Sequence, residues 1–87
     1  MDKYSKRISS INKIARHFAI SDYHVTTTFF SRNNGCEVTV FFYDIKQKES
    51  IYNYLCQYKD DNDRLTYDAF PAEDSGRKFY TYKLQKL

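Results

Sequence analysis

The stretch from Val25 to Tyr43 constrains the fold most strongly, because it predicts a β-hairpin that carries apolar side chains on both of its faces. A half-buried strand alternates apolar and polar residues, since one face packs on the core and the other meets water. One face of this hairpin carries Val25, Phe29, Val38, Val40 and Phe42. The other face carries Phe30, Phe41 and Tyr43, with threonines between them. A chain of 87 residues has little material for a second covering layer, so the second face is predicted to bind a partner or a second copy.

The turn of this hairpin is predicted at residues 33–35, which read Asn-Asn-Gly. An Asn-Gly pair is typical of a two-residue type I′ turn, because both of its central residues adopt positive φ. With Asn-Gly as the loop, Arg32 lies opposite Glu37 and Phe29 lies opposite Val40. This register pairs opposite charges near the tip and apolar side chains further in, which favours it.

The remaining elements follow from the spacing of apolar residues. Residues 3–19 and 44–59 repeat them every three or four positions, which predicts two amphipathic helices. Alternation predicts strands near 23–32, 36–43, 64–70 and 78–85. The inward-facing helix residues are predicted to be Tyr4, Ile8, Ile11, Ile14, Ala15 and Phe18 in the first helix, and Ile51, Tyr54, Leu55 and Tyr58 in the second.

The order of elements is therefore αββαββ, within a single domain that spans residues 1–87. Asp44 is predicted to cap the second helix, with Gln47 three residues later as in a capping box. The simplest arrangement is an α+β fold: one four-stranded antiparallel sheet with both helices packed on one face. The other face would then carry Phe30, Phe41 and Tyr43 together with residues of the last hairpin.

Charge is distributed in blocks of alternating sign. Residues 1–20 hold five basic side chains and one acid, residues 60–74 hold six acids and one arginine, and residues 75–87 hold four basic side chains and no acid. No apolar run approaches the roughly 20 residues of a membrane-spanning helix, and the first 20 residues lack the apolar segment of a signal peptide. We therefore expect a cytoplasmic protein without a membrane partner.

No motif indicates an enzyme, a metal site or a cofactor. The two histidines, His17 and His24, lack further ligands at metal-binding spacing, and Cys36 and Cys56 are predicted to be reduced, structural thiols. The acidic run at residues 60–63 lacks the Gly and Glu that an EF-hand loop requires, so it is predicted to be a solvated connection.

Two kinds of macromolecular binding remain. Aromatic residues suit a protein or ribonucleoprotein partner, because they give large contact area for few rotatable bonds. The predicted partner-binding residues are Phe30, Phe41, Tyr43, Tyr80 and Tyr82. The alternative is a nucleic-acid partner held through phosphate contacts of the basic first helix and the last strand. The residues predicted for that role are Lys3, Lys6, Arg7, Lys13, Arg16 and Lys78.

The general character of the chain is similar to that of small phage or mobile-element proteins that bind and inhibit host machinery, such as anti-CRISPR and other anti-defence proteins. It is short, rich in Tyr, Asn and Lys, and carries no catalytic set. This resemblance implies a non-enzymatic inhibitor that acts by occupying its target. A homodimer that buries Phe30 and Phe41 is a second way to cover the same face.

Overall fold

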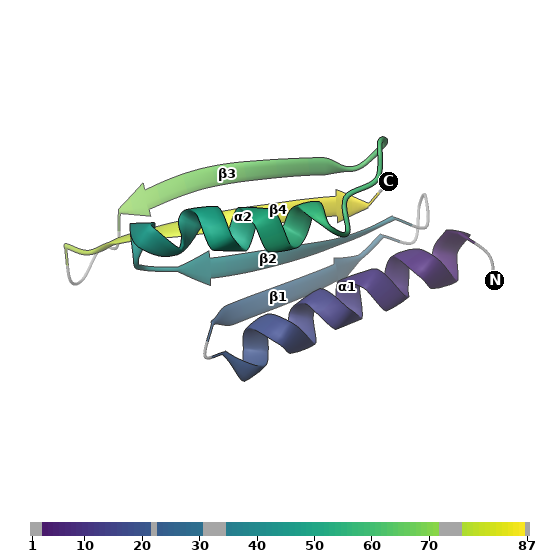
Figure 1. Ribbon diagram of the computed structural model, residues 1–87, viewed down its shortest axis with the longest axis horizontal. Helices are drawn as coiled ribbons and strands as arrows, with labels where there is room; N and C mark the ends of the chain where they lie inside the picture. Colours follow the sequence, from purple (N-terminus) through teal and green to yellow (C-terminus); the bar gives the residue numbers. More distant parts are fainter. Residues whose placement is uncertain (1–2, 22, 31–34, 72–75, 87) are drawn as a thin grey trace.

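The computed structural model describes residues 3–21, 23–30, 35–71 and 76–86. Helix α1 spans Lys3–Ile20, and a short 3₁₀ helix, η1 (Ile45–Gln47), leads directly into helix α2 (Lys48–Cys56). The strands are β1 (His24–Phe29), β2 (Cys36–Phe42), β3 (Arg64–Pro71) and β4 (Lys78–Lys86). This order of elements confirms the predicted αββαββ arrangement (Figure 1).

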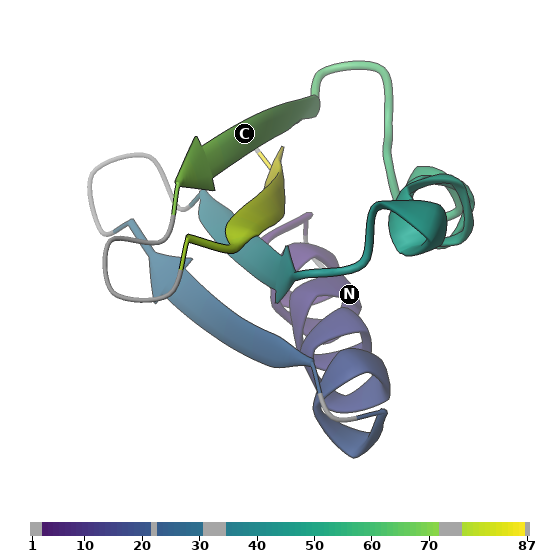
Figure 2. The ribbon, with the colours of Figure 1, turned by 90° about the vertical axis from the view of Figure 1, so that its left-hand side faces the viewer.

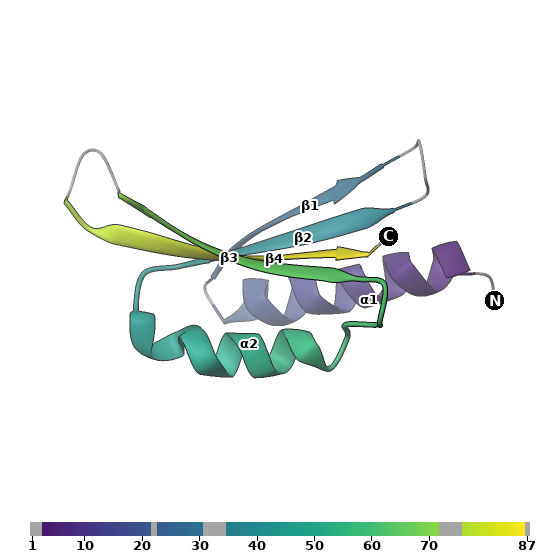
Figure 3. The same cartoon turned by 90° about the horizontal axis from the view of Figure 1, so that it is seen from above.

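The four strands form one antiparallel sheet in the order β1-β2-β4-β3. Strands β2 and β4 occupy the centre, and β1 and β3 form the two edges. Both helices lie on the same side of this twisted sheet (Figures 2 and 3), as the sequence predicts. Helix α1 packs against β1 and β2, whereas α2 lies beside β4. One face of the sheet is therefore covered, and we call the other the open face.

The core lies between the helices and the covered face. Its fully or nearly buried side chains are Ile11, Ile14 and Phe18 from α1, Ile51 and Leu55 from α2, and Cys36, Val38, Val40, Phe42, Tyr82 and Leu84 from the central strands. Burying this apolar surface is the main favourable contribution to folding. The inward helix residues predicted from periodicity are confirmed at these positions of α1 and α2. Ile8, Ala15, Tyr54 and Tyr58 are half-buried, and the side chain of Tyr4 lies outside the described set.

The start of α2 also agrees with the prediction in outline. The side chain of Asp44 accepts a hydrogen bond from the backbone N–H of Lys46 at 3.0 Å, which satisfies one of the unpaired donors at a helix start. The capped turn is the 3₁₀ helix η1. The N–H that donates to the Asp44 side chain therefore belongs to Lys46, two residues after the cap, and not to Gln47.

The predicted register of the first hairpin is wrong. Val25, and not Phe29, lies opposite Val40, and Phe29 lies opposite Cys36. Glu37 faces Thr28, while its predicted partner Arg32 lies outside the described residues. The slip is four residues, and an even slip leaves every side chain on its predicted face. The hydrophobic pattern therefore fits both registers. The Asn-Gly signal favoured the register that has a two-residue loop.

A buried ion pair fixes the connection between α2 and β3. Lys86, near the end of β4, is 2% exposed. Its Nζ donates to the carboxylate of Asp63 at 2.8 Å and to the backbone carbonyl of Tyr58, and it lies 3.4 Å from the carboxylate of Asp60. The carboxylate of Asp63 also accepts a bond of 2.8 Å from the backbone N–H of Asp60. The acidic connection is thus only partly solvated, contrary to the prediction.

Candidate binding surfaces

A row of aromatic side chains crosses all four strands at one end of the open face. His24 of β1 contacts Phe41 of β2, with ring centroids 5.1 Å apart. Phe41 contacts Phe79 of β4 at 6.3 Å, and Phe79 stacks on Phe70 of β3 at 5.3 Å. Such separations are typical of favourable aromatic pairs. We call these four rings, together with Tyr43, the aromatic row.

Tyr43 extends the aromatic row just beyond the end of β2. Its ring lies 6.4 Å from that of Phe79, and the guanidinium of Arg77 lies 4.7 Å from its centroid. A guanidinium over an aromatic face makes a cation–π contact. His24, Tyr43 and Phe70 are exposed, whereas Phe41 and Phe79 are half-buried. The row therefore presents apolar rings and one cation to solvent, with no helix above them.

Apart from Phe30, the rest of the open face is polar. Thr26, Thr28, Thr39, Thr66 and Thr81 alternate with the residues of the covered face along their strands. Between them, Gln85 donates a hydrogen bond of 2.9 Å to the carboxylate of Glu37. Thr39 and Thr81 are nearly buried in spite of lying on this face. The exposed apolar side chains of the open face are thus concentrated at the end that carries the aromatic row, and the half-buried Phe30 lies at the other end.

The predicted partner-binding residues divide into three groups. Phe41 and Tyr43 belong to the aromatic row. Phe30 has the parity of the open face but lies at the far end of β1, where its N–H bonds the carbonyl of Gly35 at 2.8 Å. Six residues of strand, about 20 Å, separate it from the position opposite Phe41.

Tyr80 and Tyr82 form the third group, and they lie on the covered face. Tyr82 pairs with Val40 and is 4% exposed, so it belongs to the core. Tyr80 is half-buried and stacks on Phe42 at 5.4 Å. Burial raises the pKa of the Tyr82 hydroxyl, with a smaller contribution from neighbouring tyrosines. The alternation of β4 points these two tyrosines toward the helices and points Phe79 outward.

The sequence prediction missed His24, Phe70, Phe79 and Arg77 as members of the aromatic site. The signal was present in part, because Phe70 and Phe79 flank the last turn and pair directly across it. Their contact with Phe41 depends on β4 lying next to β2, which is a pairing of residues far apart in sequence.

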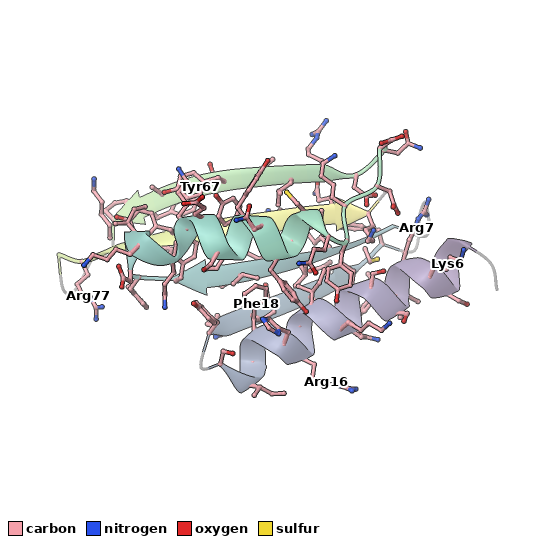
Figure 4. The ribbon with its side chains drawn as sticks, viewed as in Figure 1. Lys6, Arg7, Arg16, Phe18, Tyr67 and Arg77 are labelled. Atoms are coloured by element: carbon pink, nitrogen blue, oxygen red, sulfur yellow. The ribbon has the colours of Figure 1, made fainter. Side chains whose placement is uncertain are left out.

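The basic residues predicted for nucleic-acid binding do not form one surface. Lys6, Lys13 and Arg16 are exposed on α1 and Arg7 is half-buried, while the side chain of Lys3 lies outside the described set. Lys78 begins β4 next to Arg77, and Figure 4 shows Arg77 at the opposite end of the 45 Å molecule from Lys6 and Arg7. Lys86, also on the basic last strand, is occupied in its buried ion pair.

A shallow groove runs along the flank of α1 that faces away from α2. Its lining is Ser5, Ile8, Ser9, Asn12, Lys13 and Arg16. On the opposite flank, His17 stacks on Tyr54 of α2 with ring centroids 3.9 Å apart. The groove is thus on the side of α1 toward the β1 edge of the sheet.

The described residues show no group of three or more His, Cys, Asp or Glu side chains that could hold a metal ion. Burial raises the pKa of the Cys36 thiol, and the nearby Lys86 ammonium opposes that shift only in part. Its thiol is therefore held in the protonated, weakly nucleophilic form.

Neither helix, within the described range, is long and apolar enough to cross a membrane. No protein-family model matches the chain, and no curated protein matches its sequence.

Proposed function

We propose that this protein is a non-enzymatic binding protein that inhibits a macromolecular target by occupying its surface, and that the aromatic row is the centre of its interface. The observation that carries this proposal is the position of the row on the face of the sheet that neither helix covers (Figure 3). Aromatic rings and arginine are the side chains most enriched at the energetic centres of protein interfaces.

The charges around the aromatic row favour a protein partner over a nucleic acid. Arg77 is next to Tyr43, but Asp68 lies on the same face of β3 as Phe70, two residues away. Further along the open face, Lys83 and Glu37 also carry opposite signs. A surface that tracks phosphates concentrates cations, whereas a mixed surface suits a protein with complementary charges.

The test compares two double variants of matched exposure. Tyr43→Ser with Phe70→Ser removes two exposed rings of the aromatic row. Ile45→Ser with Tyr52→Ser removes two side chains of comparable exposure from the α2 region. Each protein serves as bait for affinity capture from the native host, and the affinity of the captured protein is then measured directly.

We expect the row variant to bind at least about tenfold more weakly than the wild type, because central interface side chains each contribute more than about 1 kcal/mol. The matched control should bind as the wild type does. Equal binding by all three proteins would contradict the placement of the interface. Loss of function of the captured target on saturation with the wild-type protein is the expected sign of inhibition by occupancy. The expectation that the protein comes from a phage or mobile element and acts against a defence system stays a prediction.

Nucleic-acid binding is the second candidate, and the exposed Lys6, Lys13 and Arg16 on α1 favour it. Binding through phosphates weakens steeply between about 50 and about 200 mM salt. Lys13→Glu with Arg16→Glu should then abolish it, while the aromatic-row variant should retain α1 contacts. No measurable affinity for DNA or RNA at low salt would remove this candidate.

A further inference from the structure

We infer that two copies of this chain pair edge to edge through β1, about a two-fold axis at Thr27. The two edges of the sheet differ in a way that points to β1. Strand β3 carries Arg64, Asp68 and Pro71, and charges and proline protect an edge against pairing. Strand β1 reads His-Val-Thr-Thr-Thr-Phe, with no acid, lysine, arginine or proline. This inference does not depend on the proposed target.

The backbone groups of β1 that point away from β2 are self-complementary. In an antiparallel pair, alternate residues direct both N–H and C=O toward the partner strand. The N–H of Phe30 bonds the carbonyl of Gly35, so the even-numbered residues of β1 direct their backbone N–H and C=O groups toward β2. Val25, Thr27 and Phe29 therefore direct their N–H and C=O groups outward. Centring the axis on Thr27 pairs all three with the second copy, and each pair exchanges two hydrogen bonds.

The side chains match in the same register. Thr27 meets Thr27 of the second copy, and Val25 meets Phe29. On the covered face this pairing shelters Phe29, which is 46% exposed in one copy although the sequence placed it under the helices. On the open face Thr26 meets Thr28, and threonine pairs are favourable across strands.

The same register also extends the aromatic row. His24 of one copy comes opposite Phe30 of the other, and both have the parity of the open face. Phe30, which is far from the row of its own copy, thus joins the row of the second copy at the position next to His24. Pairs at such a non-hydrogen-bonded position have Cα atoms about 4.5 Å apart, which brings rings into contact.

The α1 helices would also meet in this arrangement. Helix α1 packs against both β1 and β2 on the covered face and runs along the outer side of β1 in Figure 1. The two α1 helices would therefore come side by side beneath the interface, where packed helices keep their axes about 8–10 Å apart. The facing flanks would include the grooves, where Ser5 and Ser9 are small enough to allow close approach and Lys13 and Arg16 add positive charge.

The test is the mass of the full chain in solution, by sedimentation velocity at concentrations up to about 500 µM. We expect a concentration-dependent species of twice 10.5 kDa. Thr27→Pro removes only an outward N–H, and proline is tolerated on an edge strand, so this variant should stay folded and monomeric. Phe29→Asp should be monomeric too, whereas Tyr52→Asp, a matched control of 46% exposure on α2, should dimerise as the wild type does.

A covalent test covers the case in which Thr27→Pro fails to fold. Thr27→Cys in a Cys56→Ser background places two thiols at the axis, where Cα atoms about 5.5 Å apart suit a disulfide. Rapid formation of a cross-linked dimer on oxidation is expected, and Thr66→Cys on β3 should give none. A wild-type chain that remains monomeric throughout would overturn the inference. So would a dimer that survives Thr27→Pro and Phe29→Asp but is lost in the aromatic-row variant.

Discussion

Removing the ammonium of Lys86 should destabilise the fold more than any other single change of charge among the described residues. Lys86→Met keeps most of the aliphatic volume, but it leaves the carboxylate of Asp63, whose side chain is 6% exposed, without its cation. Breaking a buried pair in this way costs about 3–5 kcal/mol. A domain of 87 residues has a free energy of unfolding of about 4–13 kcal/mol, so the loss is a large part of the total.

Urea denaturation followed by circular dichroism measures this effect. With an m-value of about 1.5 kcal/mol/M, the midpoint should fall by about 2–3 M. Lys59→Met, in the same connection, is the control, because the side chain of Lys59 is exposed and its ammonium donates a hydrogen bond of 3.3 Å to the carbonyl of Asp60. Its effect should stay within about 0.5 kcal/mol.

A double-mutant cycle shows whether the pair, and not the packing of the lysine chain, causes the loss. Asp63→Asn alone leaves the ammonium of Lys86 with the carbonyl of Tyr58 and with the carboxylate of Asp60, which lies at 3.4 Å and is 86% exposed, so it should also be costly. In the Lys86→Met background the same change should cost much less, because no buried cation remains unpaired. Additive effects, or a midpoint for Lys86→Met within about 0.3 M of the wild type, would refute the reasoning.

Three further predictions concern the core and its titrating groups. Leu55→Ala should lower the free energy of unfolding by about 2–5 kcal/mol in the same urea assay, because Leu55 is fully buried and the lost side chain leaves a cavity. Burial and the hydrogen bond with the Tyr58 hydroxyl raise the pKa of Tyr54 to about 12, so stability should be full below pH 10 and fall as the pH rises from about 10 to about 12; Tyr54→Phe should reduce that slope in thermal melts. A thiol reagent should modify the exposed Cys56 at once and the buried Cys36 only on unfolding, and rapid modification of both would contradict the assigned core.

The parts of the fold that could be predicted are those that depend on local periodicity. Ile11, Ile14 and Phe18 recur at helical spacing, and Val38, Val40 and Phe42 alternate along β2, so both inner faces follow from the sequence. The position of both helices on one face then follows from the need to bury these faces together. Which residues pair across two strands is not a local property. The two faces of the first hairpin are therefore predicted correctly, whereas its register is not.

The candidate site depends on non-local pairing to a greater extent. Residues 24, 41, 70 and 79 become neighbours only because β4 enters between β2 and β3. Tyr80 and Tyr82 were predicted to bind a partner, yet the parity of β4 next to β2 places both tyrosines under the helices. In the same way, Lys86 is one of the four basic side chains counted in residues 75–87, and only its proximity to Asp63 in the folded chain shows that it is buried.

The position of Phe30 connects the β1 edge with the aromatic row. Within one copy this half-buried ring lies on the open face with no aromatic neighbour among the described contacts, about 20 Å from the end that carries the row. Pairing about Thr27 places the same ring beside His24 of the second copy. One symmetric contact would therefore shelter Phe29 on the covered face and give Phe30 an aromatic neighbour on the open face.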